Sequence, residues 1–167
     1  MNKKMNVKEI TWKEVLKDIV QNKEASNIPT GTPTPEQMRK AMQSYIDIIN
    51  QNYHEGTRNL FADQYTLEDP FGTKAVTISN ENRGESLEDK EVRFTPKKAE
   101  LISPISIAYG NQAAMAFKLW MDVGGQEVTI DIVDVMTFDE SGKIIEVAAH
   151  WGRDNVSLIN SGNDSRE

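Results

Sequence analysis

The sequence predicts one α+β domain, in which N-terminal helices cover a curved antiparallel sheet that closes like a cone around a pocket. Two observations predict this class. Residues 35 to 49 have the apolar spacing of a helix, whereas most of the chain after residue 75 alternates apolar and polar side chains as strands do. Helices that come first and an antiparallel meander that follows them favour helices packed on one face of a sheet.

The composition is typical of a single soluble domain. At 167 residues, with 38% hydrophobic side chains, the chain can bury one substantial core. A formal net charge of −7 argues against a nucleic-acid partner, which needs a basic face. No apolar run is long enough to cross a bilayer and the N-terminus lacks the features of a secretory signal, so we expect no membrane partner and a cytoplasmic location. Cysteine is absent, and His54 and His150 lie far apart in the sequence, so no metal site is expected.

An amphipathic helix is predicted over residues 10 to 23, where apolar residues recur at helical spacing from Trp12 to Val20. We expect it to dock on the main body or on a partner subunit. Residues 24 to 33 are rich in Ser, Thr, Pro and Gly and indicate a linker. The expected division is therefore an N-terminal helix and linker (1–33), a main domain (34–156) and a polar C-terminal tail (157–167).

The main domain begins with a second helix. Thr34 can cap it, Pro35 suits its first turn, and Gln37 completes a capping box. Met38, Ala41, Met42, Tyr45 and Ile49 share its inward face, so the Tyr45 hydroxyl needs a partner. A core tyrosine with a satisfied hydroxyl is more common than a catalytic one.

The rest of the domain is predicted to be mostly strand. A short helix at residues 54 to 61 precedes a strand at 65 to 68, which ends at Asp69-Pro70. Two short strands are expected at residues 76 to 78 and 91 to 95. Four longer strands, joined by turns rich in Gly, Asn and Asp, are expected near residues 99–109, 113–123, 127–138 and 144–151.

A carboxylate lies on the apolar face of one of these strands. In VTIDIVDVMTF, alternation places Asp134 on the same face as Val128, Ile130, Ile132, Met136 and Phe138. A buried acid either pairs with a cation or backbone group, or stays protonated and donates a hydrogen bond. The first role is structural, and the second can stabilise a developing oxyanion. Alternation by itself leaves both open.

Three motifs, in this order, resemble those of the Δ5-3-ketosteroid isomerases, which belong to the nuclear-transport-factor-2-like (SnoaL-like) superfamily. The motifs are TPEQMRKAMQSYIDIIN, LFADQYTLEDPFG and DVMTFDESGKIIEVAAHWGRDN. The resemblance covers about residues 34 to 156 and implies a cystatin-like α+β barrel. It places a catalytic tyrosine at Tyr45, a general base at Asp69 and an oxyanion-stabilising acid at Asp134.

The resemblance implies an isomerase that moves a carbon–carbon double bond into conjugation with a ketone, without a cofactor or metal. Its substrate would be a small, apolar, steroid-like ketone, and the protein would form a homodimer through its sheet. We expect the pocket walls to come from apolar residues that could equally be core residues, namely Phe71, Phe117, Leu119, Met136, Val147 and Trp151.

One segment departs from the family pattern. Where a helix carrying a supporting tyrosine is expected, the chain reads TKAVTISNENRGESLEDKEVRFTPKKAEL, which contains no tyrosine and has no helical pattern. Two other functions stay open. One is a polyketide cyclase, dehydratase or epoxide hydrolase. A dehydratase would use a His-Asp pair, for which His150 could serve although alternation points it away from the pocket. The other is a ligand-binding module without catalysis.

Overall fold

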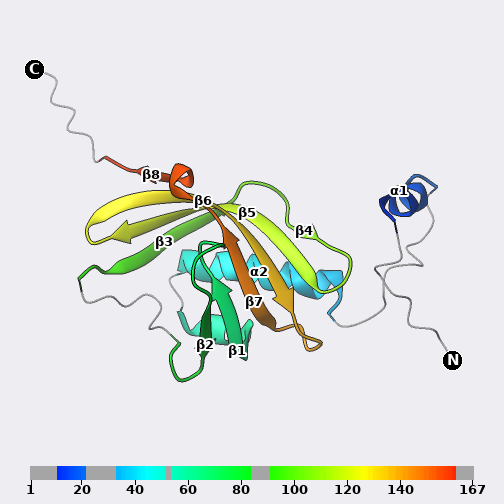
Figure 1. Ribbon diagram of the computed structural model, residues 1–167, viewed down its shortest axis with the longest axis horizontal. Helices are drawn as coiled ribbons and strands as arrows, with labels where there is room; N and C mark the ends of the chain where they lie inside the picture. Colours follow the sequence, from blue (N-terminus) through cyan, green and yellow to red (C-terminus); the bar gives the residue numbers. More distant parts are fainter. Residues whose placement is uncertain (1–10, 22–32, 52–53, 84–90, 161–167) are drawn as a thin grey trace, which may run out of the picture.

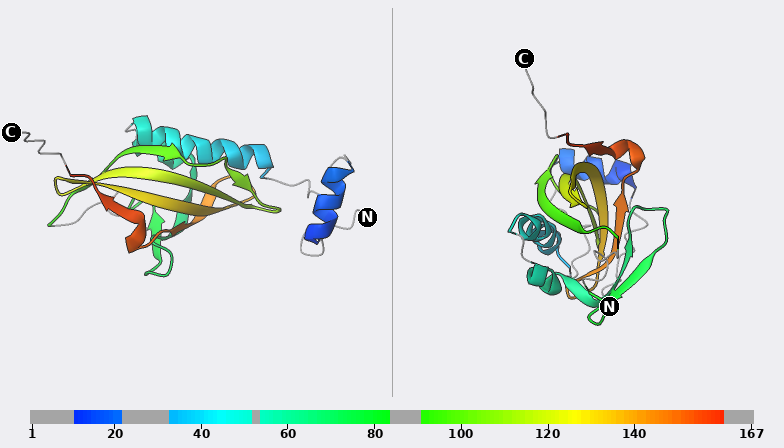
Figure 2. Two further views of the ribbon diagram at one scale, coloured as in Figure 1. Left: turned by 90° about the horizontal axis from the view of Figure 1, so that it is seen from above. Right: turned by 90° about the vertical axis from the view of Figure 1, so that its left-hand side faces the viewer.

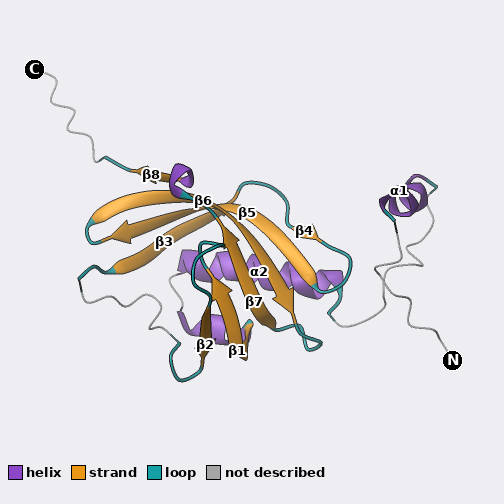
Figure 3. Ribbon diagram, viewed as in Figure 1, coloured by secondary structure: helices purple, strands orange, loops and turns teal. Residues whose placement is uncertain are grey.

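The computed structural model describes residues 11–21, 33–51, 54–83 and 91–160. Within these ranges two α-helices precede eight strands (Figure 1). Their bounds are α1 Trp12–Val20, α2 Pro35–Gln51, η2 His54–Asn59, β1 Phe61–Glu68, β2 Val76–Ser79, β3 Phe94–Leu101, β4 Ser106–Ile107, β5 Gln112–Val123, β6 Gln126–Phe138, β7 Ile144–His150, η4 Arg153–Asn155 and β8 Val156–Leu158. Figure 3 shows the predicted separation of N-terminal helices from later strands, and the α+β class is confirmed.

All strands of the described ranges join one curved sheet in the order β2-β1-β7-β6-β5-β3, with β4 beside β5 and β8 beside β6. Strands β5, β6 and β7 form the antiparallel meander that the sequence predicts. The register places Asp134 between Met115 of β5 and Ala149 of β7. Burial alternates along β6, and Asp134 faces the apolar side of the sheet with Ile132 and Met136.

The pairing of β1 corrects the expectation that the sheet is antiparallel throughout. β1 lies parallel to β7, with Leu67 opposite Val147 and Glu68 opposite Ala148. Alternation along a strand shows which side chains share a face, but it carries no information on the direction of the neighbouring strand. Because the two strands are parallel, their C-terminal ends lie side by side, and the residues that follow them, Asp69 and Trp151, become neighbours.

The region from residue 91 to 109 also differs from the prediction. The sequence predicts strands at residues 91–95 and 99–109. The structure instead has β3, which begins at Phe94, continues past Pro96 and ends at Leu101, and the short β4. Proline is tolerated in β3 because this strand lies at the sheet edge, and the register shifts between Pro96 and Lys98. The strand expected after residue 101 is interrupted by Pro104, which has no N–H to donate to a ladder.

The helix expected at residues 54 to 61 is instead the short η2, and β1 starts at Phe61, four residues before the predicted strand. Phe61 is buried in the core rather than on a helix. A register shift between Phe61 and Thr66 interrupts the pairing with β7. Such a bulge hides the strand from a search for strict alternation.

The capping box of α2 is present as predicted. The backbone N–H of Gln37 donates to Thr34 Oγ1 over 3.1 Å, and that of Thr34 donates to Gln37 Oε1 over 2.8 Å. The buried face of α2 joins the core of the sheet through Met38, Ala41, Met42 and Ile46. Figure 2 shows α2 running along one side of the sheet. The core fixes the orientation of α2 and therefore of Tyr45.

The first helix, α1, stands apart from the sheet in Figures 1 and 2, and none of its residues is buried. Its apolar face is open to solvent, with Trp12 69% exposed. The expected docking of α1 on the main body is therefore not found. Docking on a partner subunit stays a prediction, as does the homodimer.

The sheet extends past the expected domain boundary at Val156. β8 pairs with β6, with Val156 opposite Ile130 and Leu158 opposite Val128, so its residues belong to the sheet and not to a polar tail. The sheet therefore reaches Leu158, and β8 contributes side chains to the cavity described next.

Among the described helices, none has the length and apolar character needed to span a bilayer.

Candidate active site

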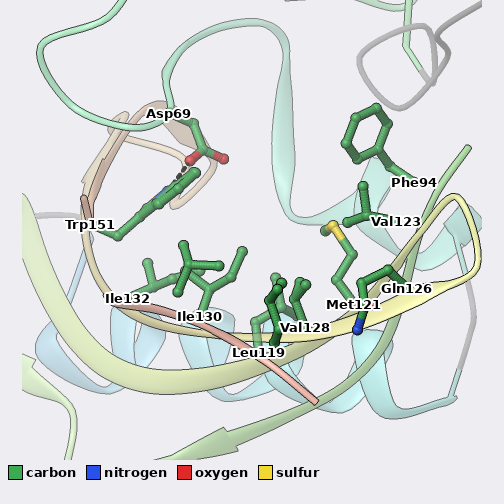
Figure 4. Close-up of a pocket in the computed structure, with 12 residues that line it drawn as sticks. Asp69, Phe94, Leu119, Met121, Val123, Gln126, Val128, Ile130, Ile132 and Trp151 are labelled. Atoms are coloured by element: carbon green, nitrogen blue, oxygen red, sulfur yellow. Dashed lines mark hydrogen bonds between the residues drawn. The ribbon is translucent and has the colours of Figure 1, made fainter. Parts of the chain in front are cut away.

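A cavity of about 460 Å³ opens on the apolar side of the sheet. Asp69 and Trp151 lie at one end of it, Phe94 and Val123 lie at the other, and Ile130 and Ile132 lie along its floor (Figure 4). The remaining lining residues are Leu119, Met121, Gln126, Val128, Val156 and Leu158. A volume within about 300–1,000 Å³ and an apolar lining suit a drug-sized apolar ligand.

Asp69 is the residue that follows β1, and its carboxylate accepts a hydrogen bond of 2.5 Å from the Trp151 indole N–H. The turn after it is tied to β7, because the Phe71 N–H donates to the Ala149 carbonyl over 2.6 Å. The Asp69-Pro70 peptide bond is cis. Asp69 is partly open to solvent at the mouth of the cavity. Partial desolvation raises the pKa of its carboxyl, and the Trp151 hydrogen bond opposes that rise.

Asp134 is the buried acid that alternation predicts, with only 3% of its surface exposed. Desolvation raises the pKa of its carboxyl to about 8, and the negative charge of Asp69 adds to the rise. No described residue forms a hydrogen bond or an ion pair with the carboxyl, so the structural role left open by the sequence has no partner there. Near neutral pH the carboxyl is mostly protonated and can donate a hydrogen bond to a ligand.

Tyr45 projects from α2, is half-buried, and lies edge-on to Phe61 with ring centroids 6.3 Å apart. Its hydroxyl has no hydrogen-bond partner in the described part of the chain. Desolvation raises the pKa of the phenol well above its ordinary value, and the charges of Asp134 and Asp69 raise it further. The phenol therefore stays neutral and keeps its proton for donation.

These three groups lie close enough to influence one another. The charge of Asp69 raises the pKa values of both Tyr45 and Asp134. The sheet register explains the placement, because Asp134 lies opposite Ala149, two residues before Trp151, whose indole binds Asp69. Of the three, Asp69 lines the cavity, whereas Tyr45 and Asp134 are not among its lining residues and are linked to Asp69 through its charge. Such an arrangement can remove a proton and stabilise the resulting oxyanion.

The six expected wall residues divide into three groups. Leu119 and Trp151 line the cavity. The other buried members lie in the core cluster that includes α2, namely Phe117, Met136 and Val147. Phe71 is exposed and stacks on His150, with ring centroids 4.6 Å apart. Alternation shows which side chains lie on the same face of a strand. It does not show which of them pack in the core and which line a cavity.

Several site residues escaped the sequence reasoning. The far end of the cavity is built by Phe94, Met121 and Val123, and by β8. Alternation along β5 and β6 could have found the members on those strands. Tyr65 also acts on the pKa of Tyr45, and Arg83 lies over the Tyr65 ring. No sequence pattern links those two residues to Tyr45.

His150 does not belong to the cavity. It is exposed on the opposite side of β7, as alternation predicts, and its Nδ1 lies 3.1 Å from the Ala148 carbonyl oxygen. A dehydratase-type pair of His150 with a cavity aspartate is therefore not formed. In the ranges that the structure describes, no three histidine or acidic side chains gather into a group that could hold a metal ion.

The raised pKa of Asp134 predicts how stability depends on pH. Because the folded acid keeps its proton up to a pH of about 8 and the unfolded acid loses it near pH 4, the wild type loses stability as pH rises between these values. The loss relative to Asp134→Asn should be about 1.4 kcal/mol per pH unit. Below about pH 4 and above about pH 8 the difference should be constant.

Urea unfolding of the two proteins from pH 3 to 9 measures this difference. Asp131→Asn is the matched control, because Asp131 lies on the outer face of the same strand, 3.4 Å from Lys118 Nζ. A constant difference between wild type and Asp134→Asn across the whole range would show that Asp134 titrates normally.

No protein-family model matches the chain. In sequence it is 28% identical over 118 residues to a steroid Delta-isomerase of Nocardioides simplex, a match that covers 69% of this chain and 89% of that protein. Its structure resembles the epoxide hydrolase/cyclase-like enzyme SalBIII, which acts in pyran ring formation in the polyether salinomycin. That match has a TM-score of 0.56 and 24% identity, and covers 75% of this chain and 98% of the other.

Both relatives are enzymes, and the structural likeness supports the fold that the three motifs predict. The sequence match links the chain to a steroid Delta-isomerase. The chain therefore has the nuclear-transport-factor-2-like (SnoaL-like) α+β fold and is similar in sequence to a steroid Delta-isomerase.

Proposed function

We propose that the protein is an isomerase that moves a carbon–carbon double bond into conjugation with a ketone, as in the conversion of a Δ5- to a Δ4-3-ketosteroid. The observation that carries the proposal is the buried Asp134, which has no described partner, a raised pKa and an electrostatic interaction with Tyr45 and Asp69. A binding module gains nothing from a buried acid without a partner, since its desolvation costs stability. A reaction that develops negative charge on oxygen makes use of such a donor.

The proposed reaction needs one base and two donors. The Asp69 carboxylate removes a proton from the carbon between the ketone and the double bond, and a dienolate forms. The dienolate oxygen accepts hydrogen bonds from the Tyr45 hydroxyl and the Asp134 carboxyl. Asp69 then returns the same proton to the far carbon of the dienolate, which leaves the conjugated ketone and restores the carboxylate. No proton is gained or lost overall.

The cavity supports an apolar substrate. Apart from Asp69 and Gln126, every lining residue is aliphatic, aromatic or a methionine. The Gln126 amide N–H groups are used within the protein, because Nε2 donates to the carbonyls of Glu127 and Ile159. The substrate is therefore a ketone whose polar atoms lie at the Asp69 end, with a hydrocarbon body along Leu119, Ile130 and Ile132.

The first test is the ultraviolet absorbance of a Δ5-3-ketosteroid incubated with the protein, because conjugation of the enone gives a direct signal. We expect turnover by the wild type that depends on Asp69 and Asp134. Absence of turnover, together with tight binding of a phenol that mimics the dienolate, would reject the steroid as substrate. It would then direct the search to the cyclisation or epoxide-opening substrates used by other enzymes of this fold.

We expect the Trp151 indole to lower the pKa of the proposed general base, Asp69. In Trp151→Phe the indole hydrogen bond to Asp69 is lost, so the pKa of Asp69 should rise and the acidic limb of the pH–rate profile should move to higher pH. The value of kcat should fall roughly two- to tenfold, since one hydrogen bond contributes about 0.5–1.5 kcal/mol. Trp120→Phe is the control, because Trp120 contacts Lys98 instead. An acidic limb that stays in place would show that the indole does not set the pKa of Asp69.

A further inference from the structure

Arg83 is a partly buried cation that the proposed reaction does not use. It follows β2, and its side chain reaches back to the start of β1, where Nη2 donates to the Ala62 carbonyl over 3.1 Å. Its guanidinium carbon lies 5.7 Å from the centre of the Tyr65 ring. The two other nitrogens, Nε and Nη1, are buried and have no hydrogen-bond partner among the residues that the structure describes.

This placement is costly, because donors of a charged group are desolvated without compensation by a hydrogen bond. The face of the Tyr65 ring supplies part of the compensation, since an aromatic face attracts a cation within about 6 Å. No described carboxylate pairs with the guanidinium. The contacts of Arg83 that the structure does show are therefore with the start of β1 and with Tyr65.

Tyr65 connects Arg83 to the candidate site through an aromatic stack formed by Tyr65, Phe61 and Tyr45. The rings of Tyr65 and Phe61 have centroids 4.2 Å apart, and those of Phe61 and Tyr45 are 6.3 Å apart with an interplanar angle of 64°. Tyr65 also contributes to the raised pKa of Tyr45. Desolvation raises the pKa of Tyr65 itself, and the charge of Arg83 opposes that rise. The contacts thus run without interruption from the guanidinium to the Tyr45 ring.

We propose that Arg83 is a positioning residue, which acts through the aromatic stack to hold the Tyr45 ring where its hydroxyl meets the oxygen of the substrate. The hydrogen bond to Ala62 fixes the start of β1, and the contact with Tyr65 fixes the ring that supports Phe61. Arg83 lies in the segment after Phe71 that contains no tyrosine, so this segment would support Tyr45 through an arginine instead. The catalytic consequence rests on the proposed function, whereas the geometric claim concerns the free protein.

The first experiment needs no substrate. The chain has four tyrosines, so tyrosine labelled with ¹³C at the ring carbon that bears the hydroxyl gives few signals, which Tyr45→Phe and Tyr65→Phe assign. In Arg83→Met, which keeps an unbranched stem but no charge, we expect both the Tyr65 and the Tyr45 signals to shift. Arg83→Gln is the second neutral variant if the first does not fold. Arg58→Met, at an exposed arginine of η2, should leave both signals in place.

Arg83→Lys keeps the charge and should restore the Tyr45 signal toward its wild-type position. In the Tyr65→Leu background, Arg83→Met should no longer move the Tyr45 signal, because the stack is already broken. A folded neutral variant in which the Tyr45 signal is unchanged would overturn the proposal. The proposal would also be overturned if Arg83→Met shifted the Tyr45 signal equally in the wild-type and Tyr65→Leu backgrounds.

Kinetics then test the consequence for the reaction. Arg83→Met should lower kcat about tenfold and change KM less than twofold. The reason is that it disturbs the hydrogen bond from Tyr45 to the substrate oxygen but not the apolar walls that bind the hydrocarbon body. If the wild type does not turn over a ketosteroid, the proposed function fails while the tyrosine signals still decide the role of Arg83. If the signals shift but kcat is unchanged, the positioning role in the reaction is rejected.

Discussion

Asp69→Asn is expected to lower kcat for conjugation of a Δ5-3-ketosteroid by about 100- to 10,000-fold, the usual contribution of a general base. The amide has nearly the shape of the carboxylate, and its oxygen can still accept the hydrogen bond from Trp151, so the turn and cavity should persist. The amide cannot accept the substrate proton, however. KM should change little, because the apolar walls of the cavity are untouched.

The ultraviolet assay under saturating substrate measures this loss. Asp63→Asn is the matched control, since Asp63 is an exposed aspartate of β1 that accepts a hydrogen bond from Asn80. It should retain wild-type kcat. Comparable activity of Asp69→Asn and wild type would remove Asp69 from the reaction and direct attention to another carboxylate.

Asp134→Leu is expected to lower kcat about 100- to 1000-fold, because it removes one of two donors to the dienolate oxygen. Asp134→Asn keeps an N–H donor and should retain more of the activity. The pH–rate profile separates the two roles of the residue. Because the pKa of Asp134 is about 8, wild-type kcat/KM should fall above that pH as the carboxyl loses the proton it donates.

The alkaline limb should be absent in Asp134→Asn, whose side chain does not titrate. Asp131→Asn should keep the wild-type profile, since Asp131 lies on the outer face and pairs with Lys118. An alkaline limb that survives in Asp134→Asn would assign the titration to another group. Normal turnover by Asp134→Leu would show that Tyr45 alone holds the dienolate oxygen.

Local patterns predict the burial of Asp134 and the inward position of Tyr45 well but the cavity poorly. Alternation in β6 identifies Asp134 as a buried acid, and the helical period of α2 turns Tyr45 inward. Asp69 came from a motif and not from periodicity. Of the expected wall residues, Leu119 and Trp151 line the cavity, whereas Phe117 and Met136 are core residues that do not line it.

The sequence by itself determined the α+β class, the meander of β5 to β7, and the faces on which Tyr45 and Asp134 lie. These depend on periods of about 3.6 and 2 residues, which each segment carries on its own. Only the tertiary structure decided the parallel pairing of β1 with β7, the contact of Asp69 with Trp151 and the position of Arg83 over Tyr65. Those depend on the direction and register of segments far apart in the chain, which packing of the whole core selects.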